Sequence, residues 1–170
     1  WWLRYAYRPE YTGGGYYTQG QDPQVWVNED QSLSTADATS IFEKDIAPNQ
    51  KPEIPQIIGG DFNSGSHLDW TKRAAAFHAG YGPVAFPTSQ LMREKNYTDS
   101  FRAIHSDEVL RPDGTFAVIY GHLQHGRIDY LYHKGPSLRP IASKIIRTPA
   151  EIDFVWPSDH AAVLTTYEIR

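Results

Sequence analysis

The first residues that could do chemistry stand at the end of an apolar run. The segment "IIGGDFNSG", residues 57–65, passes from two isoleucines through two glycines to Asp61, Phe62 and Asn63. In an extended chain, residues two apart point to the same face. The spacing therefore predicts that Asp61 and Asn63 project together, while Phe62 turns the other way into the core.

Two later segments also place polar groups at the edges of expected strands. "GRIDYLYH" carries Asp129 among aromatic and aliphatic residues, and "WPSDHAAVL" carries Asp159 and His160 just before an apolar run. Each aspartate also has a structural interpretation, because such groups commonly cap turns or pair with cations. For Asp129 the nearby cations are Arg127 and Lys134.

Taken together, these side chains suit metal-assisted hydrolysis of a phosphoester. A buried carboxylate is costly unless it is paired or binds a cation. Hard oxygen ligands hold Mg²⁺, and a bound metal polarises a phosphoryl oxygen. The amide of Asn63 can donate to a phosphate oxygen or orient a water. Asp129 is the expected partner of His160, whose tautomer it would fix and whose basicity it would raise.

The elements that must position these residues follow from the pattern of apolar and turn residues. Residues 1–34, rich in Tyr, Gly and Pro, are expected to form a loop-rich lead-in. Helical spacing predicts helices within 32–48, 67–80, 88–96 and 97–109, with Ser34, Thr88 and Thr98 as N-caps. Runs rich in β-branched and aromatic residues predict strands within 53–60, 114–121, 126–135, 138–148 and 160–170, antiparallel where the joints are tight.

Composition limits the class of protein. The chain has 170 residues, a formal net charge of −4, 40% hydrophobic residues and no cysteine. This is typical of a globular α/β protein with a single domain, here residues 1–170. Disulfides and thiolate metal sites are excluded, and no apolar window is long enough to span a membrane. The mild acidity gives no general attraction to nucleic acid.

The segments "GGDFN", "GRIDYLYH" and "PSDHAAVL", in this order, resemble the endonuclease/exonuclease/phosphatase superfamily. The resemblance covers residues from about 35 to the end, and "GDFNSGSHLDWT" with "TDSFRAIH" is similar to secreted bacterial members. It implies a four-layered α/β sandwich, with two mixed β-sheets inside and helices outside, of which 35–170 would be the part that carries the motifs.

The resemblance also implies roles for the motif residues. It implies that Asp61 and Asn63 bind the scissile phosphate and position the attacking water. It implies that Asp159, together with Asp61, contributes to a site for Mg²⁺ or Mn²⁺. It implies that His160, paired with Asp129, acts on the phosphate or as general base. The division of duties between Asp61 and His160 stays open.

The first half of the family's fold has no counterpart in this sequence. A strand-end Asn, a metal-binding Glu and a His-Leu pair, which precede the Asp-Phe-Asn motif in the family, are not found in their places. Glu29 is a candidate substitute ligand, and Trp2-Leu3 is a candidate remnant of the His-Leu position. We therefore expect a domain truncated at its N-terminus, with an exposed apolar face and part of an active site, which a second chain or an upstream segment would complete.

Several other polar residues have weaker signals. His122 and His125 have a spacing that can serve a metal, but a tight joint between strands favours an exposed turn, because zinc needs further convergent ligands. Arg127 either reaches a substrate phosphate or pairs with an acid. Asp99 is expected at the N-terminus of a helix, with Arg102 as its partner.

The sequence thus predicts a divalent-metal-dependent phosphoesterase that uses an activated water. The choice among a lipid, a sugar and a nucleotide as the substrate stays open. Thr115-Phe116 occupies a place where family members often contact the substrate. One alternative is a binding or structural module that kept the motifs without a complete metal site. The other is a nuclease, against which the acidic net charge argues.

Overall fold

The computed structural model describes residues 1–4, 22–116, 126–147 and 156–170. His122, His125 and most of the strand expected within 114–121 lie outside the described residues. Among the helices described, none combines the length and the apolar character needed to cross a bilayer.

The described chain opens with two helices and closes with three strands, and helices and strands alternate between them. The helices are α1 Pro23–Ser32, α2 Ser34–Ile41, α3 Pro87–Glu94 and α4 Ser100–Ile104. A π-helical turn, Phe42–Ile46, and a 3₁₀ turn, Ala47–Asn49, continue α2, and another 3₁₀ turn covers Ala75–Phe77. The strands are β1 Gln56–Asp61, β2 Thr98–Asp99, β3 Asp129–Lys134, β4 Leu138–Ile146 and β5 Ala162–Ile169.

Helix α1 forms where the sequence predicted a loop. Asp22 caps it, because its carboxylate accepts a hydrogen bond from the backbone N–H of Gln24 at 2.9 Å, and Pro23 occupies the first helical position. Both are signals for the start of a helix. Trp26 anchors the helix in the core with 3% of its surface exposed. The prediction of a loop is therefore wrong for residues 22–34.

The expected N-caps lie near, but not at, the starts of their helices. Ser34 is the first residue of α2, Thr88 is the second residue of α3, and Thr98 precedes the cap of α4. Asp99 is that cap, and its carboxylate accepts two backbone N–H groups of α4 at 3.0 and 3.2 Å. The position expected for Asp99 is confirmed, and the three caps proposed from hydroxyl residues are wrong.

Residues 67–80 do not form the expected helix. They make turns, with one 3₁₀ turn at Ala75–Phe77. Asp69 and Trp70 explain the difference, because these neighbours are 5% and 2% exposed and pack against different parts of the protein. The ring of Trp70 stacks on that of His78 at 3.9 Å, while the carboxylate of Asp69 pairs with arginines. Tertiary contacts override helical propensity here.

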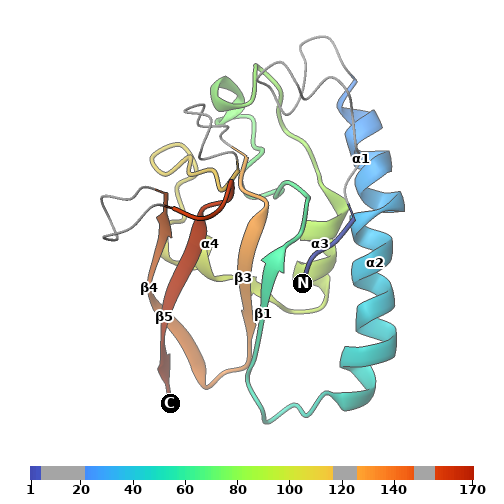
Figure 1. Cartoon of the computed structure of the whole chain (residues 1–170), viewed down its shortest axis with the longest axis vertical. Coiled ribbons are helices and arrows are strands. Elements are labelled where there is room, and N and C mark those ends of the chain that lie inside the picture. Colours follow the sequence, from blue (N-terminus) through green and yellow to red (C-terminus); the bar gives the residue numbers. More distant parts are fainter. Residues whose placement is uncertain (5–21, 117–125, 148–155) are drawn as a thin grey trace.

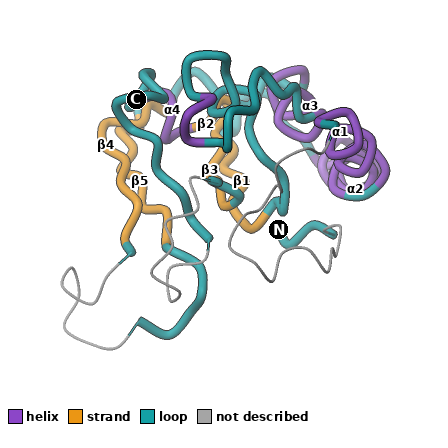
Figure 2. Tube along the Cα trace, turned by 90° about the horizontal axis from the view of Figure 1, so that it is seen from above, coloured by secondary structure: helices purple, strands orange, loops and turns teal. Residues whose placement is uncertain are grey.

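The strands form two antiparallel sheets. One has the order β1-β3-β2, and the other is the β4–β5 hairpin. The resemblance implied mixed sheets, and both described sheets are antiparallel; a parallel bridge joins Trp2 to Asp61 beside β1. Figure 1 shows β4 and β5 beside β3, and α1 and α2 stacked end to end beyond β1. Seen from above, α1, α2 and α3 gather on the side away from the hairpin (Figure 2).

The main core lies between the three-stranded sheet and the helices. Phe62 is fully buried, and its ring centre lies 5.5 Å from those of Trp1 and Tyr130 and 5.2 Å from that of Tyr132. The inward orientation predicted for Phe62 is confirmed. The other buried members of this cluster are Leu3, Ala38, Phe42, Ile58, Met92 and Tyr97.

A buried ion cluster fixes the chain just before β3. The Arg127 side chain, 0% exposed, donates from Nε to Asp69 at 3.1 Å and from Nη1 to Asp99 at 3.0 Å. Arg102 donates to the same Asp69. Burial alone would lower the pKa of Arg127, but the charges of Asp69 and Asp99 raise it well above its ordinary value. The guanidinium therefore stays charged, two residues ahead of Asp129.

Replacing Phe62 with alanine tests the core beside the end of β1. We expect Phe62→Ala to lower the free energy of unfolding by about 3–5 kcal/mol, because it removes a buried aromatic ring and leaves a cavity. Urea denaturation followed by tryptophan fluorescence measures this loss. Leu110→Ala, at a side chain that is 77% exposed, is the matched control and should stay within about 0.5 kcal/mol of the parent. A small loss for Phe62→Ala would contradict the packing described.

Candidate active site

Two carboxylates meet where β1 ends and β3 begins. Asp61 is the last residue of β1, Asp129 is the first of β3, and the two are direct partners across the antiparallel ladder. Directly opposite residues have Cβ atoms about 4.5–5.5 Å apart, and like charges there repel. Burial, followed by the charge of Asp129, raises the pKa of Asp61 to about 6. This pair favours a shared proton or a cation.

His160 joins the pair from the other sheet. It lies just before β5, and its Nδ1 is 3.0 Å from Oδ2 of Asp129, as expected from the sequence. The hydrogen bond to Asp129 raises the pKa of His160, with the charges of Asp61 and Asp159 adding to it against a partial burial that lowers it. The carboxylate favours the Nδ1–H tautomer, which leaves Nε2 to accept a proton or to bind a cation.

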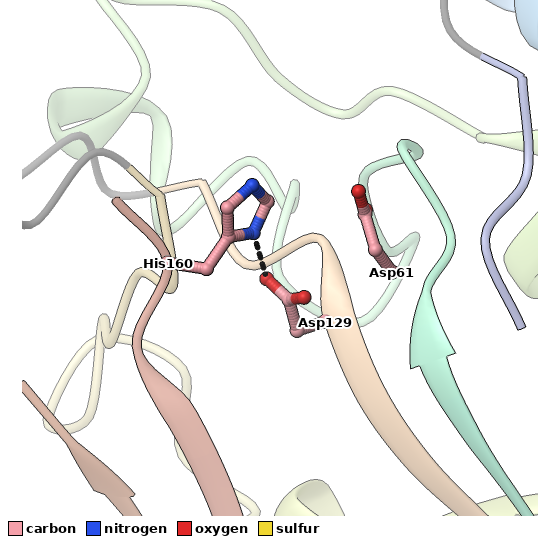
Figure 3. A group of neighbouring side chains, drawn as sticks. All are labelled: Asp61, Asp129 and His160. Atoms are coloured by element: carbon pink, nitrogen blue, oxygen red, sulfur yellow. Dashed lines mark hydrogen bonds and ion pairs between the residues drawn. The ribbon is translucent and has the colours of Figure 1, made fainter. Parts of the chain in front are cut away.

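The three side chains form one group. Asp61, Asp129 and His160 each offer a ligand atom, and these atoms all lie within 4.8 Å of one another. Figure 3 shows the two carboxylates and the imidazole arriving from three separate segments of the chain. All three are partly buried, so the group is open to solvent on one side. Such a group can bind a cation and can exchange a proton with a bound water.

Asn63 is placed differently from the expectation. Its φ of +47° ends the extended chain, so the alternation that would put Asn63 beside Asp61 stops there. Its backbone N–H donates to Oδ1 of Asp61 at 2.8 Å, and its side-chain nitrogen donates to the carbonyl of Leu3 at 2.9 Å. Asn63 therefore supports the Asp61 carboxylate through its backbone. Asparagine tolerates this left-handed conformation better than most residues.

Trp2-Leu3, the candidate remnant of the family's His-Leu pair, lies beside this turn. Trp2 forms a parallel bridge with Asp61, and the backbone N–H of Leu3 donates to the Asp61 carbonyl at 3.0 Å. Leu3 is 1% exposed, whereas Trp2 is 79% exposed. The segment thus lies parallel to the end of β1, beside Asp61.

Three other predicted residues lie outside the group. Asp159 directly precedes His160 in the chain, but its side chain is exposed and is not among the three clustered ligands. Glu29 lies on α1 and does not join the group either. The substrate-binding assignment of Arg127 is wrong, because its guanidinium is fully buried between Asp69 and Asp99. The alternative that Arg127 pairs with an acid is the correct one.

Sequence reasoning missed the buried cluster and the role of Thr115. Arg127 finds its partners 58 and 28 residues away along the chain, so no local pattern could reveal them. Thr115, noted only as a place for substrate contact, is 0% exposed and accepts the backbone N–H groups of Ile128 and Asp129.

Comparison with known proteins identifies the family of the chain. The profile of the Endonuclease/Exonuclease/phosphatase family matches residues 3–160, and the chain belongs to this family. The uncharacterized protein F14F9.5 of Caenorhabditis elegans is 30% identical over an alignment of 130 residues, and the alignment covers 68% of this chain. The match spans 41% of the length of that relative.

The pH dependence of stability tests the Asp61 environment. A carboxyl whose folded pKa is raised to about 6 from 3.8 binds its proton more tightly in the folded state, so the folded protein loses stability as the pH rises through this window. We expect Asp61→Asn to gain stability over the parent between acidic and neutral pH, measured by urea denaturation in EDTA.

Asp37→Asn is the matched control for this experiment. The side-chain hydrogen bond from Arg4 lowers the pKa of Asp37, so that carboxylate stabilises the fold above its unfolded pKa. We expect this variant to be less stable than the parent at neutral pH, with the difference vanishing in acid. If Asp61→Asn, like Asp37→Asn, made the protein less stable than the parent at neutral pH, the raised pKa of Asp61 would be contradicted.

The Asp129–His160 hydrogen bond predicts a second titration. Because that bond raises the pKa of His160, Asp129→Asn should bring the pKa down toward about 6.5, the ordinary value. NMR titration of the imidazole in EDTA measures it. In the parent, the hydrogen bond to the charged imidazole stabilises the fold fully at pH values below the pKa of His160 in the unfolded chain. This stabilisation is lost as the pH rises through the higher pKa of His160 in the folded protein. Asp107→Asn, at a surface carboxylate bonded to Arg73, should leave the His160 titration unchanged.

Proposed function

We propose that this chain is a divalent-metal-dependent phosphoester hydrolase. The observation that carries the proposal is the convergence of Asp61, Asp129 and His160, within 4.8 Å of one another, in a member of a family of phosphoesterases. A purely structural module gives no reason for a half-buried pair of carboxylates, whereas a metal-binding module without hydrolytic activity is the alternative that the experiment below separates. Such a pair is costly, and functional sites are where such costs concentrate.

The donor set fits a cation. Two carboxylates are hard oxygen ligands, which suit Mg²⁺ and Mn²⁺, and imidazole is accepted by Mn²⁺ and other transition metals. Asp61 would be the first ligand, since its carboxylate is the one that needs a compensating charge. The exposed carboxylate of Asp159, next to His160 in the chain, is a further ligand that we propose from the family resemblance. A bound ion supplies polarisation of a phosphoryl oxygen and offsets developing negative charge.

The chain's own residues supply the proton chemistry. With Nδ1 held by Asp129, the Nε2 of His160 can accept a proton from a water that attacks phosphorus, and the carboxylate stabilises the imidazolium that forms. Alternatively, the protonated ring donates to a phosphate oxygen. Asn63, whose backbone N–H holds the Asp61 carboxylate, keeps Asp61 oriented while charge moves nearby. We propose that Asp61 and Asn63 bind the phosphate and position the water.

Hydrolysis of bis(p-nitrophenyl) phosphate tests the proposal. We expect turnover with Mg²⁺ or Mn²⁺, none with EDTA, and a rate about 10²–10⁴ lower in His160→Ala, which is the usual contribution of a general acid or base. His67→Ala is the matched control, because His67 bonds to Ser89 and Arg93 and is not part of the clustered group. It should keep parental turnover.

Two outcomes would overturn this function. Turnover that survives both EDTA and His160→Ala would mean that the group does no chemistry. Absence of turnover, together with a rise in the unfolding midpoint on adding Mg²⁺ that Asp61→Asn abolishes, would favour a metal-binding module, since a ligand stabilises the state that binds it. A plasmid and a lipid phosphodiester, assayed side by side, then separate a nuclease from an enzyme acting on small molecules.

A further inference from the structure

Thr115 lies between the two members of the Asp129–His160 pair. Its side chain is fully buried, with 0% of its surface exposed. Its hydroxyl oxygen, Oγ1, accepts the backbone N–H of Ile128 at 3.0 Å and that of Asp129 at 3.1 Å. Two consecutive peptide groups at the start of β3 therefore share one acceptor.

The backbone of Thr115 reaches the other member of the pair. Its carbonyl accepts the N–H of Ala161, the residue after His160, at 2.7 Å. The next residue, Phe116, forms an antiparallel bridge with His160, and the two rings lie 4.9 Å apart. The chain around Thr115 is thus bonded on one side to the backbone that carries Asp129 and on the other side to the backbone that carries His160.

From this geometry we propose that Thr115 is a positioning residue for the Asp129–His160 pair. This inference rests on the proposed function for its catalytic meaning. Among the strands that the structure describes, no ladder joins the two sheets, since Asp129 belongs to the β1-β3-β2 sheet and His160 precedes the hairpin strand β5. The hydrogen bonds of Thr115 hold the backbone of Asp129 and the backbone next to His160 in place relative to each other. Without Oγ1, the N–H groups of Ile128 and Asp129 lose this acceptor, and the bonds that tie the start of β3 to the segment beside His160 are lost.

The test compares substitutions that keep or remove this oxygen. Thr115→Val preserves the shape of the side chain and removes the acceptor, whereas Thr115→Ser keeps the acceptor and removes a methyl group. We expect Thr115→Val to lower kcat about 10²-fold with little change in KM, because small misplacement of a catalytic group affects the chemical step. Thr115→Ser should stay near the parent.

Thr88→Val is the matched control. Thr88 is also a buried threonine, 1% exposed, and its hydroxyl bonds to Asp30 on α1 rather than to the site. It should lose stability without losing kcat. If Thr115→Val does not fold, Thr115→Cys, with a weakly accepting sulfur of similar size, replaces it in the comparison.

A second readout needs no activity. Long-range ¹H–¹⁵N spectra of the neutral His160 ring, recorded in EDTA well above its titration, report which nitrogen carries the proton. The parent, Thr115→Ser and Thr88→Val should show the Nδ1–H tautomer held by Asp129, and Thr115→Val should show a mixture of tautomers.

The outcomes separate this inference from the proposed function. An inactive parent whose His160 tautomer still depends on the Thr115 oxygen would overturn the hydrolase and keep the positioning role. An active parent in which Thr115→Val keeps both kcat and the single tautomer would overturn the positioning role and keep the hydrolase. Equal losses in Thr115→Ser and Thr115→Val would show that the hydroxyl oxygen is not the group that acts.

Discussion

The buried guanidinium of Arg127 holds together three parts of the chain, one of which leads into Asp129 of the site. Asp69 brings in the turns after β1, Asp99 brings in β2 and the start of α4, and Arg127 itself leads into β3. Breaking a buried ion pair by removing one partner typically costs about 3–5 kcal/mol, because the remaining charge stays buried. The cluster therefore fixes the start of β3, and with it the backbone of Asp129, more firmly than the ladder with β1 alone could.

Around that fixed point the protein holds two charges that repel each other. Asp61 and Asp129 face each other at the ends of their strands, and the pKa of Asp61 rises to about 6 through burial and through the charge of Asp129. His160 partly compensates by bonding to Asp129. The nearby core, which includes Phe62, Tyr130 and Tyr132, contributes the stability that offsets this repulsion.

The residues of the site could be predicted from the sequence because they depend on local pattern. Asp61, Asp129 and His160 each adjoin an apolar run with the character of a strand, and all three runs are strands in the structure. The partners of Arg127 could not be predicted, because a buried arginine and a phosphate-binding arginine look alike until distant aspartates are placed in space. The helix expected at 67–80 failed for the same reason. In contrast, α1 could have been predicted from the sequence, because Asp22-Pro23 is a local signal for the start of a helix. The composition of the surrounding segment suggested a loop instead.

Because Asp129 begins β3 and His160 precedes β5 of the other sheet, the Asp129–His160 pair depends on how the two sheets are held together. Besides the bonds at Thr115, the sheets are joined by Ser100, whose hydroxyl lies 2.8 Å from Nδ1 of His133 on β3 and 2.6 Å from the hydroxyl of Tyr167 on β5. A slip of the hairpin against β3 would separate the imidazole from its carboxylate while the aromatic core stayed closed. Regions of a protein open with different free energies. The Asp129–His160 hydrogen bond can therefore break while the helices and strands stay formed.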